Sequence, residues 1–473
     1  MPLPTIPSGN VASALGGGYE VANSCRFNRP DSPYMHITPG SDGDLRKFTV
    51  SFWCKRGLLT TGGTTGRQVI FSTATNDAIT FDGSNDTLAI LEDGGNALVP
   101  NRVFRDCSAW YHIVVAVDTE QGVAANRIKL YVNGVLETSF STTCQTSQNA
   151  DMGFGKGSEM MSVGRSEYDD NRHFDGYLAE FYYINNSQLA ASDFGEFDED
   201  SPTIWKPKAF SGSFGTNGFY LDFEDSSNLG NDANGGTDLT EVNLAAADQA
   251  SDSPTNNFAT MNPLDNIGAT TFSEGNNKLL WTATNKTNKS TIGVTKGKWY
   301  AECFAVDVNS GTTGAVIGVG GPGALASTYL NGADISGWGY RCQTGNIQNS
   351  AGNEAYGDTW AENDVIGVAL DMDNGAVYMS KNGTWQDSGD PTSGASKTGA
   401  ANNQPSYGSA ISGTEFFACS AYDTDSLAWN FGGCPSFAIS SGNADADGYG
   451  NFEYAPPTGY YALCTKNLAE YGG

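Results

Sequence analysis

The residues whose spacing best suits hydrolytic chemistry are the acidic pair Glu196 and Asp198. Glycoside hydrolysis needs two carboxyl groups, one acting as acid and the other as base or nucleophile. Here the two carboxyl groups stand on alternate residues, but the acidic run ends in Asp200 and lies just before Pro202. These polar surroundings favour a solvated acidic loop over a strand that lines a cleft. We therefore expect a non-enzymatic protein, with glycan hydrolase or depolymerase activity as the less favoured alternative.

Other signatures of catalysis and cofactor binding are equally weak. His112 follows Trp110 and Tyr111 on a predicted strand, and no G-x-S-x-G nucleophile motif accompanies it. The glycine-rich stretch Gly318–Gly323 follows a strand, but no helical pattern comes after it, which argues against nucleotide binding. The nine cysteines form no CxxC pair, so zinc is not expected, and we interpret most of them as small buried hydrophobic residues of a protein made in a reducing cytoplasm.

Charge and hydropathy exclude further classes of function. The chain has 473 residues with 53 acidic and 25 basic side chains, a formal net charge of −28. Such a chain repels nucleic acid and anionic membrane surfaces. The first 20 residues lack the basic and apolar regions of a secretory signal, and no run of 18 apolar residues occurs. We therefore expect no nucleic-acid partner and no membrane insertion.

The elements that would position any site are predicted to be strands. The chain contains 59 glycines, which stand with Asn, Asp, Ser and Thr between short apolar runs, as in strands joined by tight turns. Residues 48–56 alternate, with Phe48, Val50, Phe52 and Cys54 on one face. Residues 127–140 form a predicted hairpin, in which Asn133 and Gly134 suit a two-residue turn. The only helix candidate is short, from Gln188 to Phe194.

These patterns predict an all-β protein of two antiparallel β-sandwich (jelly-roll) domains in tandem, joined by an irregular connector. The predicted divisions are an N-terminal arm (1–20), a first sandwich (21–200), a connector that could pack on the first sandwich (201–264), a second sandwich (265–440) and a C-terminal strap (441–473).

Each half resembles a known family. The first half, with FTVSFWCKR, WYHIVVAVD, KLYVNG and FDGYLAEFYYI in that order, resembles the laminin-G/concanavalin-A-like sandwich over about residues 20–200. The second half, with GKWYAECFAV, IGVG, GDTWAENDVIGVALDMDNGAVYMSKNG and LAWNFGG, resembles the SPRY/B30.2 sandwich over about 270–440.

The two resemblances imply candidate sites. Laminin-G modules often bind calcium through an aspartate and backbone carbonyls at a sheet edge, and the aspartates in suitable predicted loops are Asp82, Asp86, Asp118 and Asp170. SPRY-like domains bind partners through loops at one end, where aromatic side chains can stack on sugars or anchor a protein. The candidates there are Trp338, Tyr340, Trp360 and Trp385. No cofactor is required on this interpretation, and calcium is the one candidate.

The pairing of the two domains also resembles tail-fibre and other virion-surface proteins of tailed bacteriophages, particularly those of marine bacteria. The segments Ser192–Asp232 and Ser251–Asp265 resemble junctions in such proteins. This resemblance implies a virion-surface protein made in the host cytoplasm, which contacts other virion proteins and a glycan or protein of the host surface. A homo-oligomer, with a trimer favoured, or repeated copies would raise avidity. A capsid decoration or head-fibre protein is the alternative.

Overall fold

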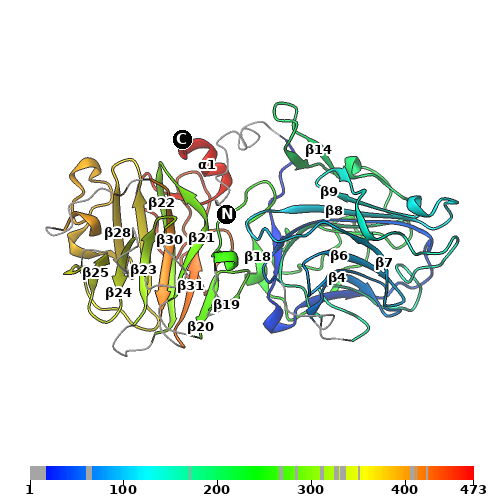
Figure 1. Cartoon of the computed structure of the whole chain (residues 1–473), viewed down its shortest axis with the longest axis horizontal. Helices are drawn as coiled ribbons and strands as arrows, with labels where there is room; N and C mark the ends of the chain where they lie inside the picture. The colour runs from blue at the N-terminus through cyan, green and yellow to red at the C-terminus, as the bar shows by residue number, and fades with distance from the viewer. Residues whose placement is uncertain are drawn as a thin grey trace. The chain divides into compact units, whose positions relative to one another are not determined.

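A computed structural model of the chain describes residues 18–59, 66–169, 172–265, 270–282, 286–308, 314–323, 330, 337–349, 352–404, 411, 413–421 and 424–473. The chain divides into two compact units between Thr255 and Asn256. We call Leu15–Thr255 the first domain and Asn256–Gly473 the second domain. Both are built almost wholly from antiparallel strands, which confirms the predicted all-β class (Figure 1).

The first domain contains two large sheets that enclose one hydrophobic core. The first of them, which we call the main sheet, has the order β10 (Val135–Leu136), β9 (Ile128–Val132), β8 (Tyr111–Asp118), β3 (Lys47–Arg56), β13 (Gly176–Asn185), β1 (Ser24–Phe27) and β18 (Gln249–Ala250), with β16 (Phe219–Leu221) also paired to β13. The opposite sheet has the order β11 (Phe140–Thr142), β7 (Gly95–Pro100), β6 (Leu88–Glu92), β5 (Ala78–Phe81), β4 (Gln68–Thr73), β12 (Met161–Val163), β2 (Tyr34–Ile37) and β17 (Thr240–Val242).

The alternation in β3 decides which side chains enter the core. Phe48, Val50, Phe52 and Cys54 lie in the core between the sheets, as the sequence predicts. In β13, by contrast, every residue is buried, on both faces of the sheet. The outer face is covered by a second hydrophobic cluster, drawn mainly from residues 189–220, which packs on Val114, Tyr182 and Ile184. A continuous apolar run is the expected sequence of a strand that is buried on both sides.

Residues 201–255 of the predicted connector pack on the first domain, the option that the sequence left open. Its strands β16, β17 and β18 pair with β13, β2 and β1 of the first domain. Close to the end of the connector, the Asp252 carboxylate forms an ion pair with the Lys55 ammonium at 2.7 Å and accepts a hydrogen bond from the Trp110 indole N–H at 3.1 Å. The Lys55 and Asp252 side chains are 1% and 2% exposed. This buried ion pair fastens the end of the connector to the main sheet.

The structure confirms the main hairpin turn and overturns the one helix predicted in this domain. Asn133 and Gly134 have φ values of 47° and 79°, which confirms the predicted two-residue turn between β9 and β10. The predicted helix over 188–194 is wrong, because only a single 3₁₀ turn, η5 (Ala191–Asp193), forms there. The short 3₁₀ turns of this domain are η2 (Arg29–Asp31), η4 (Ala124–Asn126), η5 and η6 (Ala246–Asp248).

The second domain is also a sandwich of two sheets. Its larger sheet has the order β19 (Thr270–Ser273), β20 (Lys278–Trp281), β31 (Ser426–Asn430), β22 (Lys298–Asp307), β27 (Val365–Asp371), β28 (Ala376–Lys381) and β29 (Thr384–Trp385), with β32 (Tyr461–Ala462) paired in parallel to β22. The other sheet has the order β21 (Lys286–Val294), β30 (Glu415–Ala421), β23 (Val316–Gly320), β24 (Gly337–Arg341), β25 (Asn346–Asn349) and β26 (Gly352–Ala355). The short helices are η7 (Pro263–Asp265), η8 (Gln386–Ser388), η9 (Gly394–Ser396), η10 (Ala401–Asn403) and α1 (Thr465–Tyr471).

The C-terminal strap of the second domain is held by a buried carboxylate. Glu302 on β22 accepts the backbone N–H groups of Glu453 at 2.9 Å and Tyr454 at 2.7 Å. The strap then continues into β32 and the seven-residue helix α1, which the sequence patterns did not predict. No disulfide joins any of the nine cysteines, and all but Cys144 are buried.

A second buried carboxyl group, Glu415 at the start of β30, gives a test of the second domain's core. Glu415 is 5% exposed, and its Oε2 has no hydrogen-bond partner in the described part of the chain. Burial raises the pKa of Glu415 to about 8. The folded state therefore holds the proton more tightly than the unfolded state, and stability falls as the pH rises from the usual glutamate range to about 8.

Replacing Glu415 by glutamine should remove this loss. We expect Glu415→Gln to raise the melting temperature of the second domain at pH 8.5 by about 3–6 °C and to change it little at pH 3.5, where the wild-type carboxyl is mostly protonated in both states. Thermal unfolding across this pH range checks the prediction, with the exposed Glu470→Gln as the matched control. An advantage that is equal at both pH values would contradict it.

Candidate functional site

The outer face of the main sheet carries an unusual group of polar and aromatic side chains. Trp53 on β3 and His112 on β8 are register partners, and their rings stack with centroids 4.8 Å apart. Ser51 stands two residues before Trp53, on the same face, and its hydroxyl lies 2.9 Å from His112 Nε2. Both Ser51 and His112 are buried. The alternation of β3 and β8, which sends the core residues inward, therefore sends these three outward.

A small hairpin lies over this face. It is formed by β14 (Gly195–Phe197) and β15 (Trp205–Pro207), in which Phe197 pairs with Trp205. The Trp205 ring stacks on His112 at 5.9 Å, and its indole N–H donates to His112 Nδ1 at 2.9 Å. Phe197 meets Trp205 edge to face at 4.9 Å. The hairpin thus places two aromatic rings above the sheet.

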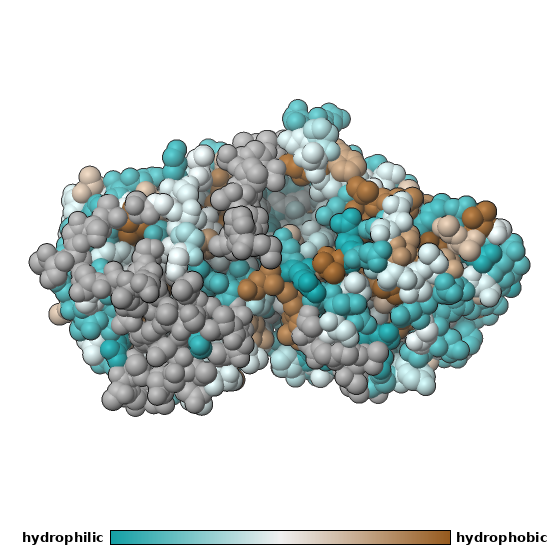
Figure 2. All heavy atoms as spheres, viewed as in Figure 1, coloured by the Kyte–Doolittle hydropathy of each residue, from teal (hydrophilic) through white to brown (hydrophobic). Residues whose placement is uncertain are grey.

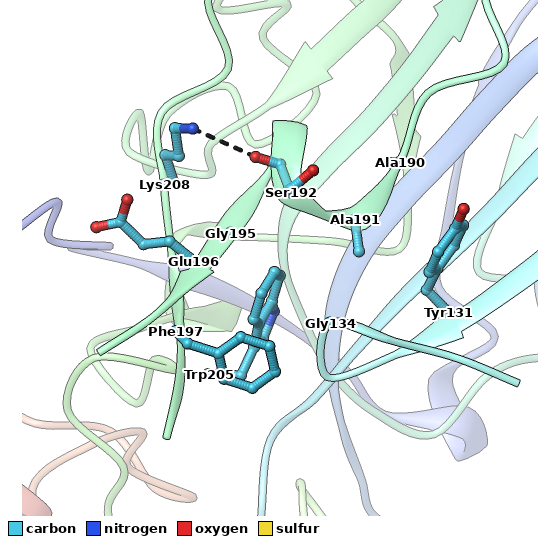
Figure 3. Close-up of a pocket in the computed structure, with 10 residues that line it drawn as sticks. All are labelled: Tyr131, Gly134, Ala190, Ala191, Ser192, Gly195, Glu196, Phe197, Trp205 and Lys208. Carbon is cyan, nitrogen blue, oxygen red and sulfur yellow. Dashed lines mark hydrogen bonds between the residues drawn. The ribbon is translucent and has the colours of Figure 1, made fainter. Parts of the chain in front are cut away.

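Two recesses adjoin these rings, with volumes of about 330 and 300 Å³. Phe197 and Trp205 line both recesses and so form the ridge between them. We call the two recesses together the Trp205 groove. The other lining residues are Tyr131, Gly134, Ala190, Ala191, Ser192, Gly195, Glu196 and Lys208 on one side, and Trp53, Arg102, Trp110, Val132, Asn133, Val135 and Thr203 on the other. Figure 3 shows the Trp205 and Phe197 rings side by side, with Glu196 and Lys208 to one side of them and Tyr131 to the other.

The rim of the groove is partly apolar and partly charged. Phe197 is 42% exposed, and Val135 and Leu136 on the edge strand β10 are 55% and 45% exposed. Figure 2 shows hydrophobic patches (brown) on the mostly hydrophilic surface of the first domain, one of them beside the place of β14. Exposed apolar patches with polar rims mark interaction sites and ligand-binding grooves. Aromatic faces there can stack on a sugar ring or anchor a protein side chain.

Opposite charges balance one another around the groove. The Lys206 ammonium lies 3.5 Å from both the Glu196 and the Asp198 carboxylates. Arg102 pairs with Glu137 at 2.8 Å. On a chain with a formal net charge of −28, this locally balanced surface repels an approaching acidic partner less than an unpaired acidic surface would.

The Ser51–His112 pair is not arranged as a nucleophile and its base. An indole N–H can only donate, so the hydrogen bond from Trp205 requires an unprotonated Nδ1 on His112. The proton of the neutral ring therefore sits on Nε2 and is donated to the Ser51 hydroxyl. Burial lowers the pKa of His112 to about 3, which keeps the ring neutral. A base for Ser51 would need the opposite arrangement, with a free lone pair at Nε2.

The structure corrects the expectation for the acidic run. Glu196 lies in strand β14 and not in a loop, although it remains exposed. Asp198 is buried and accepts the backbone N–H groups of Asp200 and Ser201, so it shapes the turn after the strand. Both carboxylates share Lys206.

Three of the four aromatic candidates of the second domain lie in its core. Trp338, Tyr340 and Trp360 are 8%, 0% and 3% exposed and belong to the core. Tyr340 also donates its hydroxyl to the backbone carbonyl of Asp358. Trp385 is half-buried and packs on a different cluster, near Tyr300. Trp338, Tyr340 and Trp360 thus lie inside the sandwich, whereas Trp385 keeps part of its ring exposed.

The aspartates considered singly as calcium ligands make other contacts where the structure describes them. Asp86 is buried between Arg56 at 3.1 Å and Arg105 at 3.0 Å. Asp82 caps the backbone N–H of Ser84. Asp118 shapes its own turn, and Asp170 lies outside the described residues. Within the described ranges, no group of three or more His, Cys, Asp or Glu side chains could hold a metal ion.

Sequence reasoning missed the Trp205 groove because its residues come from distant segments. Trp205 was visible only as an aromatic residue in a proline-punctuated connector. The one local feature that relates to the groove is a pair of glycines, Gly134 and Gly195. A Cβ on Gly134 would lie 2.3 Å from the Trp205 ring, and a Cβ on Gly195 would lie 2.5 Å from it. Both positions need glycine because the indole packs directly against the backbone.

This packing predicts a measurable strain in one variant. Gly195→Ala should destabilise the first domain by about 1–3 kcal/mol, because the new methyl group must displace the Trp205 ring. Gly122→Ala is the matched control, since a Cβ there meets no atom within 4 Å. Urea unfolding of the two variants checks the prediction, and equal effects would contradict the packing described here.

Comparison with known proteins agrees with the two sandwiches. Residues 30–191 match the concanavalin A-like lectin/glucanases superfamily, of laminin-G type, and residues 298–400 match the SPRY domain family. A search of curated proteins found no match to the chain. Among the helices of the described residues, none is both long enough and apolar enough to span a bilayer.

Several solved structures are similar in fold. The SPRY domain of human HERC1 is 18% identical with a TM-score of 0.27, over 36% of this chain and 94% of that one. A second human SPRY domain is 14% identical with a TM-score of 0.25, over 34% of this chain and 94% of that one. A candidate carbohydrate-binding protein from Bacteroides ovatus is 17% identical with a TM-score of 0.31, over 47% of this chain and 58% of that one.

Proposed function

Because the chain carries a concanavalin-A-like domain followed by a SPRY domain, we propose that it is a non-enzymatic surface protein of a tailed bacteriophage. In this proposal it belongs to the tail fibre or tail tip and contacts a glycan or protein of the host surface. The resemblance of the domain pairing and of its junctions to such virion proteins supports this choice.

The observation that carries the proposal is the Trp205 groove. It offers a ridge of two aromatic rings between two recesses, with an apolar rim and balanced charges. Such a surface suits a ligand that packs against the aromatic rings and the apolar rim. The Ser51–His112 pair has the wrong tautomer for nucleophilic catalysis, and Glu196 and Asp198 share a lysine. Binding is therefore the function that these residues support best.

The proposal also covers the binding partners of the chain, its copies on the particle and the compartment in which it is made. The high net negative charge disfavours nucleic acid, so the partners are other virion proteins and the host surface ligand. Single contacts of this size bind weakly, and several copies, with a trimer favoured, raise the avidity on the particle. The absence of disulfides among the nine cysteines suits synthesis in the reducing host cytoplasm.

An adsorption assay tests the proposal. Host cells are incubated with the purified full chain before phage particles are added, and unadsorbed particles are counted over time. We expect the chain to bind the cells and to slow adsorption in a concentration-dependent way. Cells of a strain that the phage does not adsorb to serve as the control. A chain that neither binds host cells nor slows adsorption would overturn the assignment to host contact.

A further inference from the structure

A chain of hydrogen bonds runs beneath the Trp205 groove. Ser51 Oγ lies 2.9 Å from His112 Nε2, and His112 Nδ1 lies 2.9 Å from Trp205 Nε1. The same imidazole is stacked between two indoles, Trp53 at 4.8 Å and Trp205 at 5.9 Å, with interplanar angles of 25° and 22°. His112 thus contacts Trp205 both through its ring face and through a directed hydrogen bond.

The direction of these bonds is fixed. The indole N–H is a donor only, so His112 must accept at Nδ1 and donate from Nε2. The Ser51 hydroxyl can accept that second bond. Burial lowers the pKa of His112 to about 3, so the ring stays a neutral acceptor at any pH at which a host cell lives. The described side chains that face His112 are the two indoles and the Ser51 hydroxyl, none of which carries a charge.

The remaining contacts leave the Trp205 ring little room. Gly134 and Gly195 pack against it so closely that a Cβ at either position would clash. Phe197 meets its edge. Within this space, the hydrogen bond to His112 Nδ1 fixes the direction in which the indole N–H of Trp205 points. The same bond occupies the N–H, which is the only polar group of the indole.

We propose that His112 is the positioning residue of the groove: it holds Trp205 as a fixed, purely apolar ridge between the two recesses. This inference rests on the proposed function, because it assumes that the groove contacts the ligand. It implies that the ligand meets Trp205 by apolar contact alone. Polar selection then comes from the rim, from Glu196, Lys208 and Tyr131 on one side and Arg102 on the other.

Two substitutions at one position separate the acceptor from the ring. His112→Phe keeps a flat ring for stacking but offers no acceptor to Trp205. His112→Asn loses the ring but can present an amide oxygen close to the place of Nδ1. His173→Phe is the control, because His173 is also buried but lies in another part of the domain, beside Tyr34.

The first readout needs no ligand. In the full chain labelled with ¹⁵N-tryptophan, the indole N–H signal of Trp205, assigned through Trp205→Phe, is followed during exchange into D₂O. We expect exchange at least about tenfold faster in His112→Phe, near wild-type exchange in His112→Asn, and no change in His173→Phe. Unchanged protection in His112→Phe, or loss of protection in His112→Asn equal to that in His112→Phe, would overturn the inference.

The second readout is the binding of the labelled full chain to host cells. We expect His112→Phe to weaken it by about tenfold and His112→Asn to restore most of it. If His112→Phe loses binding while Trp205 keeps its protection, His112 does not act through Trp205 and the inference fails. If the wild-type chain does not bind cells, the proposed function fails, and the exchange experiment still decides whether His112 positions Trp205. If His112→Phe does not fold, His112→Asn decides, since loss of Trp205 protection there overturns the inference.

Discussion

Asp252→Ala is expected to destabilise the first domain by about 3–5 kcal/mol, which is a large share of a typical domain's stability. The substitution leaves the Lys55 ammonium, which is 1% exposed, without the carboxylate that it contacts at 2.7 Å. It also removes the acceptor of the Trp110 indole N–H. The removal of one partner of a buried ion pair is far more costly than the loss of a surface ion pair. Urea unfolding of the full chain, followed through the transition of the first domain, measures the effect.

The chain offers a close control for this experiment. Arg46 and Asp151 pair at 2.6 Å, but their side chains are 40% and 56% exposed. Since water screens exposed ion pairs, Asp151→Ala should leave the unfolding midpoint unchanged within error. The double variant Lys55→Met/Asp252→Leu should recover most of the stability that Asp252→Ala loses, because it buries no charge. Equal effects of Asp252→Ala and Asp151→Ala would show that burial does not decide the strength of this contact.

The second large effect concerns binding. Phe197→Ala should weaken the attachment of the labelled chain to host cells by at least about 30-fold, as expected for an aromatic residue at the centre of a binding surface. Phe197 is 42% exposed and forms half of the ridge, so its removal should change the groove more than the fold. Titration of cells with the labelled chain gives the apparent affinity.

Tyr168 serves as the control for Phe197. It is an exposed aromatic residue of the same domain, 65% exposed, and it does not line the groove. Tyr168→Ala should bind as the wild-type chain does. A loss of binding in Tyr168→Ala as large as that in Phe197→Ala would indicate a general effect of exposed aromatic residues. Unchanged binding in Phe197→Ala would contradict a contact between the Trp205 groove and the ligand.

The sequence predicted the fold far better than the site. Period-two alternation in 48–56 and the Asn133–Gly134 turn act over a few residues, so they could be predicted without tertiary information. The pairing of residues 219–250 with β13, β2 and β1 depends on contacts across the domain, and the connector could only be left open. The short helix α1 likewise carries no side-chain cap that would announce it.

The positions of the candidate site residues could not be predicted for a related reason. An aromatic residue beside a strong strand can point either inward or outward, and Trp338, Tyr340 and Trp360 point inward. Asp86 looked like a loop ligand for a metal because its partners, Arg56 and Arg105, are 30 and 19 positions away. The groove itself joins side chains from β3, β9, β10, β14 and β15. No local pattern brings those five strands together.

The proposal that the chain is a virion protein in contact with the host is tested most directly by its location. Antibodies against the chain, labelled with gold, are applied to purified phage particles and viewed by electron microscopy. We predict label at the tail fibres or the tail tip. Label spread over the head would make the chain a capsid decoration or head-fibre protein and contradict the proposed contact with the host, and particles without label would contradict a place on the virion surface.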